Sequence, residues 1–281
     1  MPRRPFIALL SIAMSLMLAS PTAAAPGPEP AGAAAVTPPD GPAQAWLVAD
    51  LDSGRILGGR DPYSAHAPAS TIKALLAMVV LDQLAPNAAV RASAAHTQVE
   101  CSCVGLIPGQ VYTARQLLDG LLMVSGNDAA NLLADMLGGY QAAVLRMNAK
   151  AYQLGVRSTR AGSPSGLDGP GWESVTSPHD LAVIYRAALR YPLFAQIVHQ
   201  PSALFPDRSG YREIKNQDRL LRSYPGFIGG KSGFTNLARE TYVGMAQRNG
   251  RRLIVVQMYG SADLWDQASR LLDWGFNQYG H

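Results

Sequence analysis

The sequence predicts an α+β fold, in which early and late strands share one sheet and the segment between them is helical. Three observations support this prediction. Short β-rich segments occur at residues 45–57 and again at residues 242–246 and 253–259. Segments with helical periodicity fill the region between them, and a further one lies at residues 262–276. The length of 281 residues is sufficient for a large buried core.

The first 42 residues are expected to lie outside the folded domain. Residues 1–25 resemble a secretory signal, because Arg3 and Arg4 precede an apolar run and a cluster of alanines suited to cleavage. Residues 26–42 are rich in Pro, Ala and Gly, which predicts a flexible linker. The folded domain is therefore predicted to span residues 43–281. The expected location is outside the cytoplasm, periplasmic or extracellular and associated with the cell envelope; a cleaved signal and a retained anchor both stay open.

A hairpin and a helix are the first predicted elements. Residues 45–50 alternate weakly, Asp52-Ser53-Gly54 provides a turn, and residues 55–57 resume the apolar pattern. Residues 70–84 place their apolar side chains in one stripe, which predicts a helix that begins after Pro68.

The middle of the chain is predicted to be helical, with helices at residues 113–124, 127–137 and 140–154. Residues 163–171 are rich in Gly, Pro and Ser and predict a loop. Ser177 is expected to cap the next helix, with Pro178 in its first turn. Toward the end of the chain, Asn249-Gly250 predicts a tight turn between the two late strands. After residue 42 no segment is long and apolar enough to span a bilayer.

Composition argues against several functional classes. A net charge of +4 gives no case for nucleic acid binding. The five histidines are scattered and form no cluster with the cysteines at metal-ligand spacing, so neither a metal nor a cofactor is predicted. Cys101 and Cys103 are separated by one residue; in an exported protein such a pair can oxidise, and a disulfide and two free thiols both stay open.

Three short motifs indicate a catalytic function. In chain order they are Ser70-Thr71-Ile72-Lys73, Ser125-Gly126-Asn127 and Lys231-Ser232-Gly233. A serine hydroxyl is a weak nucleophile until a base removes its proton. A lysine one helical turn away can be that base if burial and neighbouring charge lower its pKa. The chain has four lysines, and two of them lie in the two motifs that require one. This coincidence favours a catalytic interpretation over three unrelated surface motifs.

Each residue of the first two motifs has a predicted role. Ser70 is the nucleophile and Lys73 its base. Ser125 is expected to relay a proton between Lys73 and the leaving amine. Asn127 is expected to hydrogen-bond either the substrate amide or Lys73 itself.

The third motif and its next two residues are predicted to bind substrate. Lys231 supplies a positive charge for a substrate carboxylate, and the hydroxyl of Ser232 donates to the same group. Gly233 allows the strand edge to approach the substrate closely. The backbone N–H of Phe234 is expected to complete an oxyanion hole with that of the nucleophile. The hydroxyl of Thr235 is a further candidate contact to the carboxylate.

These motifs and their surroundings resemble low-molecular-mass D-alanyl-D-alanine carboxypeptidases, which are penicillin-binding proteins of the S11-type serine peptidase family and of the β-lactamase/transpeptidase-like superfamily. The likeness includes residues 108–130, 165–168, 177–182 and 229–235, and it runs from about residue 45 to about residue 258. Departures from the family pattern are few. Serine stands at position 232 where threonine is usual, arginine at 239 where glycine is frequent, and the cysteine pair is not part of the general pattern.

The resemblance implies a five-stranded, mainly antiparallel sheet flanked by helices, a helical subdomain, and an active site in the cleft between them. It implies a serine-type DD-peptidase whose catalytic domain spans residues 43–281. Such an enzyme removes the terminal D-Ala from peptidoglycan stem peptides through an acyl-enzyme on Ser70, and β-lactams acylate the same serine. The family requires no metal or cofactor.

Two other functional classes stay open at this point. A β-lactamase requires a deacylation base, for which Glu173 lies in the right stretch of sequence but lacks the asparagine of the family spacing. A non-catalytic envelope module that binds penicillin or glycan is the third alternative. The balance between carboxypeptidase, endopeptidase and transpeptidase activity, the oligomeric state and the role of Arg239 are not decided by the sequence.

Overall fold

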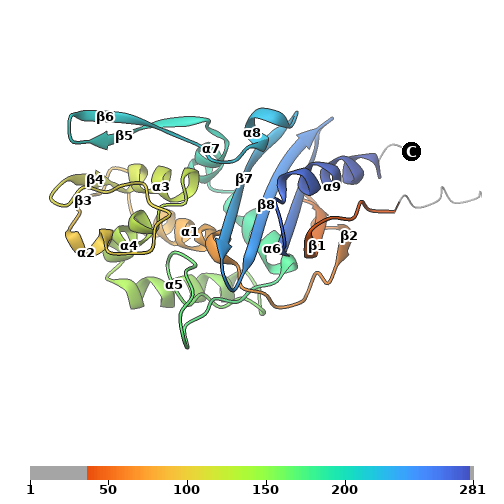
Figure 1. Ribbon diagram of the computed structural model, residues 1–281, viewed down its shortest axis with the longest axis horizontal. Coiled ribbons are helices and arrows are strands. Elements are labelled where there is room, and N and C mark those ends of the chain that lie inside the picture. The colour runs from red at the N-terminus through yellow and green to blue at the C-terminus, as the bar shows by residue number, and fades with distance from the viewer. Residues whose placement is uncertain (1–36, 279–281) are drawn as a thin grey trace, which may run out of the picture. The chain divides into compact units, whose positions relative to one another are not determined.

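The computed structural model of the protein describes residues 37–278, and its elements follow the predicted order of strands, helices and strands (Figure 1). One antiparallel sheet has the strand order β2-β1-β9-β8-β7. Its strands are β1 (Ala43–Asp50), β2 (Ile56–Arg60), β7 (Phe227–Thr235), β8 (Arg239–Arg248) and β9 (Arg251–Gly260). Pairing of β1 with β9 joins the two ends of the described chain, which confirms the predicted five-stranded α+β architecture. The predicted signal and residues 26–36 of the predicted linker lie outside the described residues.

The two predicted turns of the sheet are present. Between β1 and β2, Oδ1 of Asp50 accepts the backbone N–H of Ser53 at 2.7 Å, and Gly54 has a φ of +79°. Between β8 and β9, Asn249 and Gly250 both have positive φ values, of 49° and 77°. Positive φ at both central positions matches the twist of a two-residue hairpin, which is why the Asn-Gly pair predicted this turn.

Helices pack on both faces of the sheet. On one face lie α1 (Lys73–Gln83) and α6 (Pro178–Ala188), and on the other lies α9 (Trp265–Asn277). Side chains alternate along β8, so that Val243 and Met245 join the core around α1, whereas Tyr242 and Ala246 join the smaller core under α9. The sheet therefore separates two hydrophobic cores.

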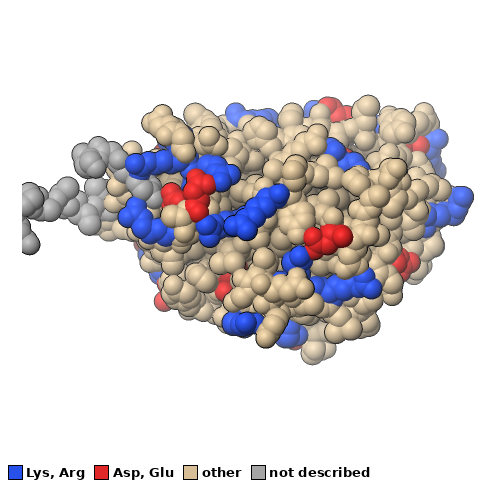
Figure 2. Space-filling view, turned by 180° about the vertical axis from the view of Figure 1, so that it is seen from behind, with Lys and Arg blue, Asp and Glu red and all other residues tan. Residues whose placement is uncertain are grey.

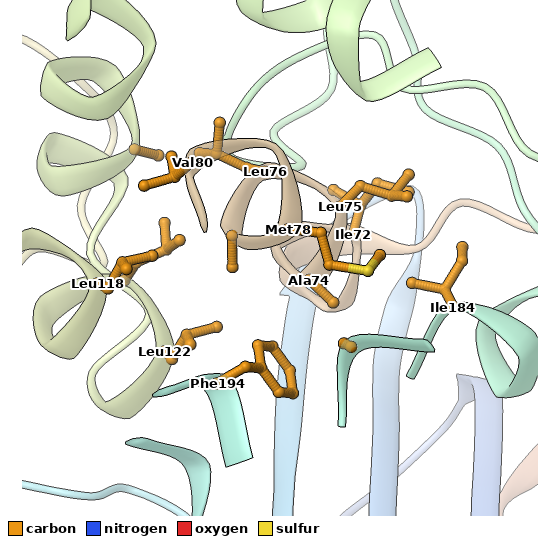
Figure 3. Close-up of a cluster of buried hydrophobic side chains, with 14 of the residues drawn as sticks. Ile72, Ala74, Leu75, Leu76, Met78, Val80, Leu118, Leu122, Ile184 and Phe194 are labelled. Carbon is orange, nitrogen blue, oxygen red and sulfur yellow. The ribbon is translucent and has the colours of Figure 1, made fainter. Parts of the chain in front are cut away.

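Helix α1 is buried on more than the single stripe that its sequence predicts. Eight of its eleven residues are buried. The reason is its position, because it lies between the sheet and a helical lobe and contacts Leu118, Ile184 and Phe194 from three different helices (Figure 3). The α-helix begins at Lys73 and is preceded by a 3-10 turn, η1 (Ala69–Ile72).

The helical lobe contains α2 (Ala94–Thr97), α3 (Ala114–Met123), α4 (Asn127–Met136) and α5 (Tyr140–Gln153), with a small ribbon of β3 (Ala89–Arg91) and β4 (Val111–Thr113). The three longer helices match their predicted ranges to within one residue. Ser177 caps α6 as predicted: its side chain accepts the backbone N–H of Asp180, and Pro178 stands in the first turn.

Further elements were not predicted from the sequence: α7 (Pro192–His199), the hairpin of β5 (Ser202–Asp207) and β6 (Gly210–Lys215), and α8 (Leu220–Ser223). The predicted closing helix begins at Trp265, three residues later than expected. Within residues 37–278 no single helix meets the length and hydropathy expected of a membrane span; α6 and α7 meet it only when taken together, across a bend of 108°.

Candidate active site

Ser70 lies in the 3-10 turn that precedes α1, where the sheet meets the helical lobe. The residue before it, Ala69, has a φ of +48°, a conformation that non-glycine residues adopt rarely. The carbonyl of Pro68 holds this turn, because it accepts hydrogen bonds from the hydroxyls of Thr71 at 2.7 Å and Thr241 at 2.9 Å. One hydrogen bond thus stabilises the turn internally, and the other attaches it to β8.

Lys73 is fully buried and contacts the predicted nucleophile directly. Its Nζ donates to Oγ of Ser70 at 2.6 Å, to Oδ1 of Asn127 at 2.7 Å and to the carbonyl of Ser165 at 2.7 Å. Burial lowers the pKa of this amine well below its ordinary value, and the charge of nearby Lys231 lowers it further against an opposing contribution from Asp128. A lysine whose neutral form is favoured in this way is suited to accept the hydroxyl proton of Ser70.

Ser125 lies in the break between α3 and α4 with a φ of +62°. Nζ of Lys231, from β7, donates to Oγ of Ser125 at 2.9 Å and to the carbonyl of Ser232 at 2.6 Å. Burial lowers the pKa of Lys231 to about 7, although the buried carboxylate of Asp218 acts in the opposite direction. The second and third motifs therefore meet through one hydrogen bond that crosses the cleft.

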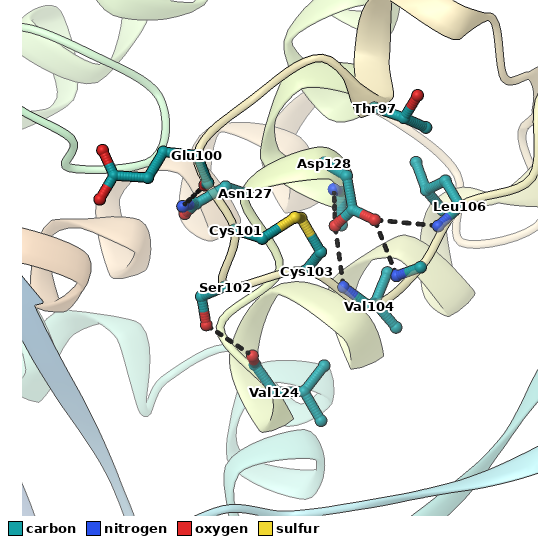
Figure 4. Close-up of a disulfide and its surroundings, with 12 residues drawn as sticks. Thr97, Glu100, Cys101, Ser102, Cys103, Val104, Leu106, Val124, Asn127 and Asp128 are labelled. Atoms are coloured by element: carbon teal, nitrogen blue, oxygen red, sulfur yellow. Dashed lines mark hydrogen bonds between the residues drawn. A yellow bond between two sulfur atoms is a disulfide. The ribbon is translucent and has the colours of Figure 1, made fainter.

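Asn127 connects the first motif to the loop around residues 100–103, whose position beside the site was not predicted from the sequence. While its Oδ1 accepts from Lys73, its Nδ2 donates to the carbonyl of Glu100 at 2.6 Å, and its backbone N–H donates to the carbonyl of Ser102 at 2.7 Å. The flanking residues of Ser102 form a disulfide, Cys101–Cys103, which resolves the alternative that the sequence left open (Figure 4).

Asp128 holds the next part of the same loop. Its carboxylate is buried and accepts backbone N–H groups from Val104 at 2.9 Å, Gly105 at 2.8 Å and Leu106 at 2.9 Å (Figure 4). Hydrogen bonds from several backbone donors satisfy a buried carboxylate without a cationic partner. Asp128 is therefore a structural residue beside the site.

Gly233 brings the edge of β7 against the nucleophile. A Cβ atom at this position would lie 2.7 Å from the backbone nitrogen of Ser70 and 2.7 Å from Oγ1 of Thr241. Since real Cβ contacts are never this close, only glycine fits. The backbone nitrogen of Ser70 therefore lies close to β7, the strand that carries Phe234, whose N–H is the other predicted donor of the oxyanion hole.

Thr235 has a partner that the sequence analysis did not consider. Its hydroxyl donates to Oδ2 of Asp168 at 2.6 Å and accepts the backbone N–H of Ala238 at 3.0 Å. A hydroxyl has a single proton, so in this conformation Thr235 holds the loop at residues 163–171 rather than offering a donor to a ligand.

A cleft of about 280 Å³ lies over these residues. Of the predicted site residues, those that line it are Ser70, Ser125, Asn127, Ser232, Gly233, Phe234 and Thr235. Lys73 and Lys231 lie buried beneath them. The cleft is also lined by Glu100, Ser102, Gln217, Glu240 and Trp265, which sequence reasoning missed. Their positions depend on long-range packing, and no local pattern in the sequence marks them. Within residues 37–278 no group of His, Cys, Asp or Glu side chains is arranged to hold a metal ion.

Comparison with known proteins gives a consistent result. The family model described as D-alanyl-D-alanine carboxypeptidase, peptidase S11, matches residues 32–262. A curated D-alanyl-D-alanine carboxypeptidase, DacB2 of Mycobacterium tuberculosis, is 60% identical over 253 residues, which cover 88% of this chain and 86% of that protein.

Solved structures agree with this assignment. The crystal structure of a D-alanyl-D-alanine carboxypeptidase from M. tuberculosis H37Rv superposes with a TM-score of 0.85 at 60% identity, covering 89% of this chain and 96% of that one. The Streptomyces K15 DD-transpeptidase superposes with a TM-score of 0.80 at 29% identity, covering 86% and 100%. The predicted fold and the predicted class of enzyme are thereby confirmed, and the chain belongs to the peptidase S11 family of D-alanyl-D-alanine carboxypeptidases.

Proposed function

We propose that this D-alanyl-D-alanine carboxypeptidase removes the terminal D-Ala of peptidoglycan stem peptides through an acyl-enzyme on Ser70. The observation that carries this proposal is a pair of hydrogen-bonded groups that meet at the cleft: Ser70, Lys73 and Asn127 form one, and Ser125 and Lys231 form the other. This arrangement supports the proposal because it offers Lys73 for proton transfer and Lys231 for binding of the substrate carboxylate.

In the proposed acylation step, neutral Lys73 takes the proton of Ser70 while the serine oxygen attacks the carbonyl of the penultimate D-Ala. The backbone N–H groups of Ser70 and Phe234 stabilise the negative charge that develops on the carbonyl oxygen. Ser125 passes a proton to the leaving amine and is resupplied from Lys73. Charged Lys231 and the hydroxyl of Ser232 hold the terminal carboxylate.

Water then hydrolyses the ester to release the shortened peptide. A β-lactam presents a strained amide beside a carboxylate in similar geometry, so we expect it to acylate Ser70 in the same way. Hydrolysis of that adduct requires a well-placed base. Glu173, the candidate in the sequence, is not among the residues that line the cleft, and its Oε1 accepts the backbone N–H of Gly171 at 3.1 Å. This placement favours a carboxypeptidase over a β-lactamase.

We further propose that the protein acts outside the cytoplasm in the cell envelope, where its peptidoglycan substrate lies. The signal-like residues 1–25 support this location. The shared acyl-enzyme also serves endopeptidases and transpeptidases, whose acceptors differ. Water is favoured as the acceptor because the M. tuberculosis relative that is 60% identical is a carboxypeptidase.

Intact mass spectrometry after incubation with benzylpenicillin tests the proposal. We expect a persistent adduct of one penicillin per chain on the wild type and none on Ser70→Ala. Ser64→Ala, which changes an exposed serine outside the cleft, is the matched control and should still form the adduct. Rapid turnover of the drug would favour the β-lactamase, and neither adduct nor turnover would favour the non-catalytic module.

A further inference from the structure

The side chain of Glu100 lies at the wall of the cleft and has no partner among the described residues. Its backbone carbonyl is held by Nδ2 of Asn127 at 2.6 Å, while its carboxylate extends away from the disulfide loop (Figure 4). The residue is exposed and lines the same cleft as Ser70. The main chain of Glu100 is therefore fixed to Asn127, while its carboxylate is free to contact a bound ligand.

The direction of a bound peptide follows from the fixed contacts. The terminal carboxylate belongs at Lys231 and Ser232, and the reacting carbonyl belongs at Ser70. The rest of the peptide must leave on the opposite side, past Asn127. Asn127 contacts the backbone carbonyl of Glu100. Glu100 therefore lies beside the part of the peptide that precedes D-Ala-D-Ala.

A second cavity extends the cleft in this direction. Its volume is about 420 Å³, and Leu167 lines both cavities. The acidic side chains that line the two cavities are Glu100, Glu240 and Asp135, and the last contacts His96 at 2.8 Å. Among the described residues that line them there is no lysine or arginine, although the chain carries 24 such residues.

Basic side chains lie elsewhere on the molecule. Figure 2 shows them outnumbering acidic ones on the face that it displays. The side chains exposed in the two cavities therefore include carboxylates but no lysine or arginine, whereas Lys73 and Lys231 lie buried beneath the cleft. An exposed carboxylate on the cleft wall attracts a cationic ligand group at that point.

We propose that Glu100 is a specificity-determining residue that recognises a free amine on the side chain of the peptide residue directly before D-Ala-D-Ala. This proposal rests on the proposed function, because it assumes that the cleft binds such peptides. The preferred substrate class is accordingly peptides with a diamino acid at that position and an unmodified side-chain amine.

Two peptides that differ only in this charge test the proposal. Nα-acetyl-L-Lys-D-Ala-D-Ala has a free ε-amine, whereas Nα,Nε-diacetyl-L-Lys-D-Ala-D-Ala has none. Release of D-Ala gives kcat/KM for each. We expect the wild type to prefer the free amine by about two- to fivefold, the range of an exposed ion pair. The preference should decrease when salt is added, because exposed charges are screened.

Variants assign the preference to one side chain. Glu100→Gln should bring the ratio of the two kcat/KM values to about one, Glu100→Asp should keep a ratio above one, and Glu100→Lys should invert it, as expected for an exposed pair. Glu213→Gln on β6, an exposed carboxylate that does not line the cleft, is the matched control for net charge and should leave the ratio unchanged. Circular dichroism checks that each variant is folded.

The possible outcomes separate the two proposals. A wild type that cleaves both peptides equally, or a Glu100→Gln variant that keeps the preference, overturns the role of Glu100 but leaves the carboxypeptidase intact. A wild type that releases D-Ala from neither peptide overturns the proposed function and this inference together.

Discussion

Nζ of Lys231 lies 2.9 Å from Oγ of Ser125, and this hydrogen bond joins the edge strand of the sheet to the break between two helices of the lobe. The two residues are 106 positions apart in the sequence. The geometry gives Ser125 a cationic neighbour on the side of the expected leaving group, and it makes the relay and the carboxylate site parts of one unit.

Ser125→Ala is expected to slow acylation by about 100-fold or more, because a positioned proton donor contributes this much in general acid–base catalysis. The rate of adduct formation with benzylpenicillin, followed by quenched-flow mass spectrometry, measures the effect. Ser64→Ala provides the control for loss of a hydroxyl outside the cleft. A rate for Ser125→Ala within about twofold of wild type would exclude the relay, since that is far below the usual contribution.

The pH dependence of D-Ala release is expected to be bell-shaped. The acid limb reports loss of the proton from Lys73, whose pKa lies well below its ordinary value, so activity rises with pH before the range in which ordinary lysines titrate. The alkaline limb reports Lys231, whose pKa is about 7 in the free enzyme. Above that pH the substrate carboxylate loses its charged partner, so KM should rise while kcat changes less.

The control for the alkaline limb is a peptide that ends in an amide. It lacks the carboxylate that Lys231 would hold, so its KM should be high and independent of pH across the same range. Equal alkaline limbs for the acid and the amide would assign that limb to another group.

Gly233→Ala is expected to lower kcat by about 10²- to 10³-fold, the usual cost of losing one oxyanion-hole donor. The added Cβ would lie 2.7 Å from the backbone nitrogen of Ser70, so β7 must move away from the nucleophile and take the N–H of Phe234 with it. Ser232→Ala is the comparison, because it removes a carboxylate contact and should act mainly on KM. If Gly233→Ala retained the wild-type kcat, Phe234 would not belong to the oxyanion hole.

Asp128→Ala is expected to lower the free energy of unfolding by about 3 kcal/mol or more, because several backbone donors lose their acceptor and each costs roughly 1–3 kcal/mol when buried. Replacing both cysteines by serine should cost less. The bridge spans a sequence separation of 2, and closure of so short a loop is worth about 1.5 kcal/mol in the chain-entropy treatment. Urea denaturation compares the two variants, and the reverse order would contradict the structural role of Asp128.

Thr235→Val and Asp168→Asn are expected to be coupled, because the hydroxyl of Thr235 donates to Asp168 at 2.6 Å. A double-mutant cycle on the free energy of unfolding should give an interaction energy of about 1 kcal/mol. Thr235→Ser keeps the hydroxyl and should restore most of the loss. Strictly additive changes would show that the contact does not hold the loop.

The sequence was a good guide where chemistry requires particular residue types at fixed spacing. Ser70 and Lys73 are three positions apart, so one helical turn suffices to bring them together, and the Asn249-Gly250 turn is likewise decided by local backbone conformation. Residues of this kind are predictable because the interaction that places them is short in sequence.

Contacts between distant segments escaped prediction. Nothing in the local pattern around Asp168 indicates that it meets Thr235, and nothing around Glu100 indicates that it lines the cleft. Helix α1 shows the same limit, because its burial on several sides results from the lobe that packs over it and not from its own periodicity. The hairpin of β5 and β6 also depends on outside packing: Phe205 stacks on Tyr112 of the lobe, with ring centroids 5.4 Å apart.

The close approach of Gly233 to Ser70 has an evolutionary consequence. No side chain can be introduced at that point of β7 without displacing the strand, so mutation cannot reshape this wall of the cleft gradually. The opposite wall is an exposed loop around Glu100, whose main chain is held by the Cys101–Cys103 disulfide and by the amide of Asn127 without any contact from the Glu100 side chain. We therefore expect homologous enzymes to diverge in substrate preference through substitutions in this loop, while glycine is retained at position 233 of the strand that faces it.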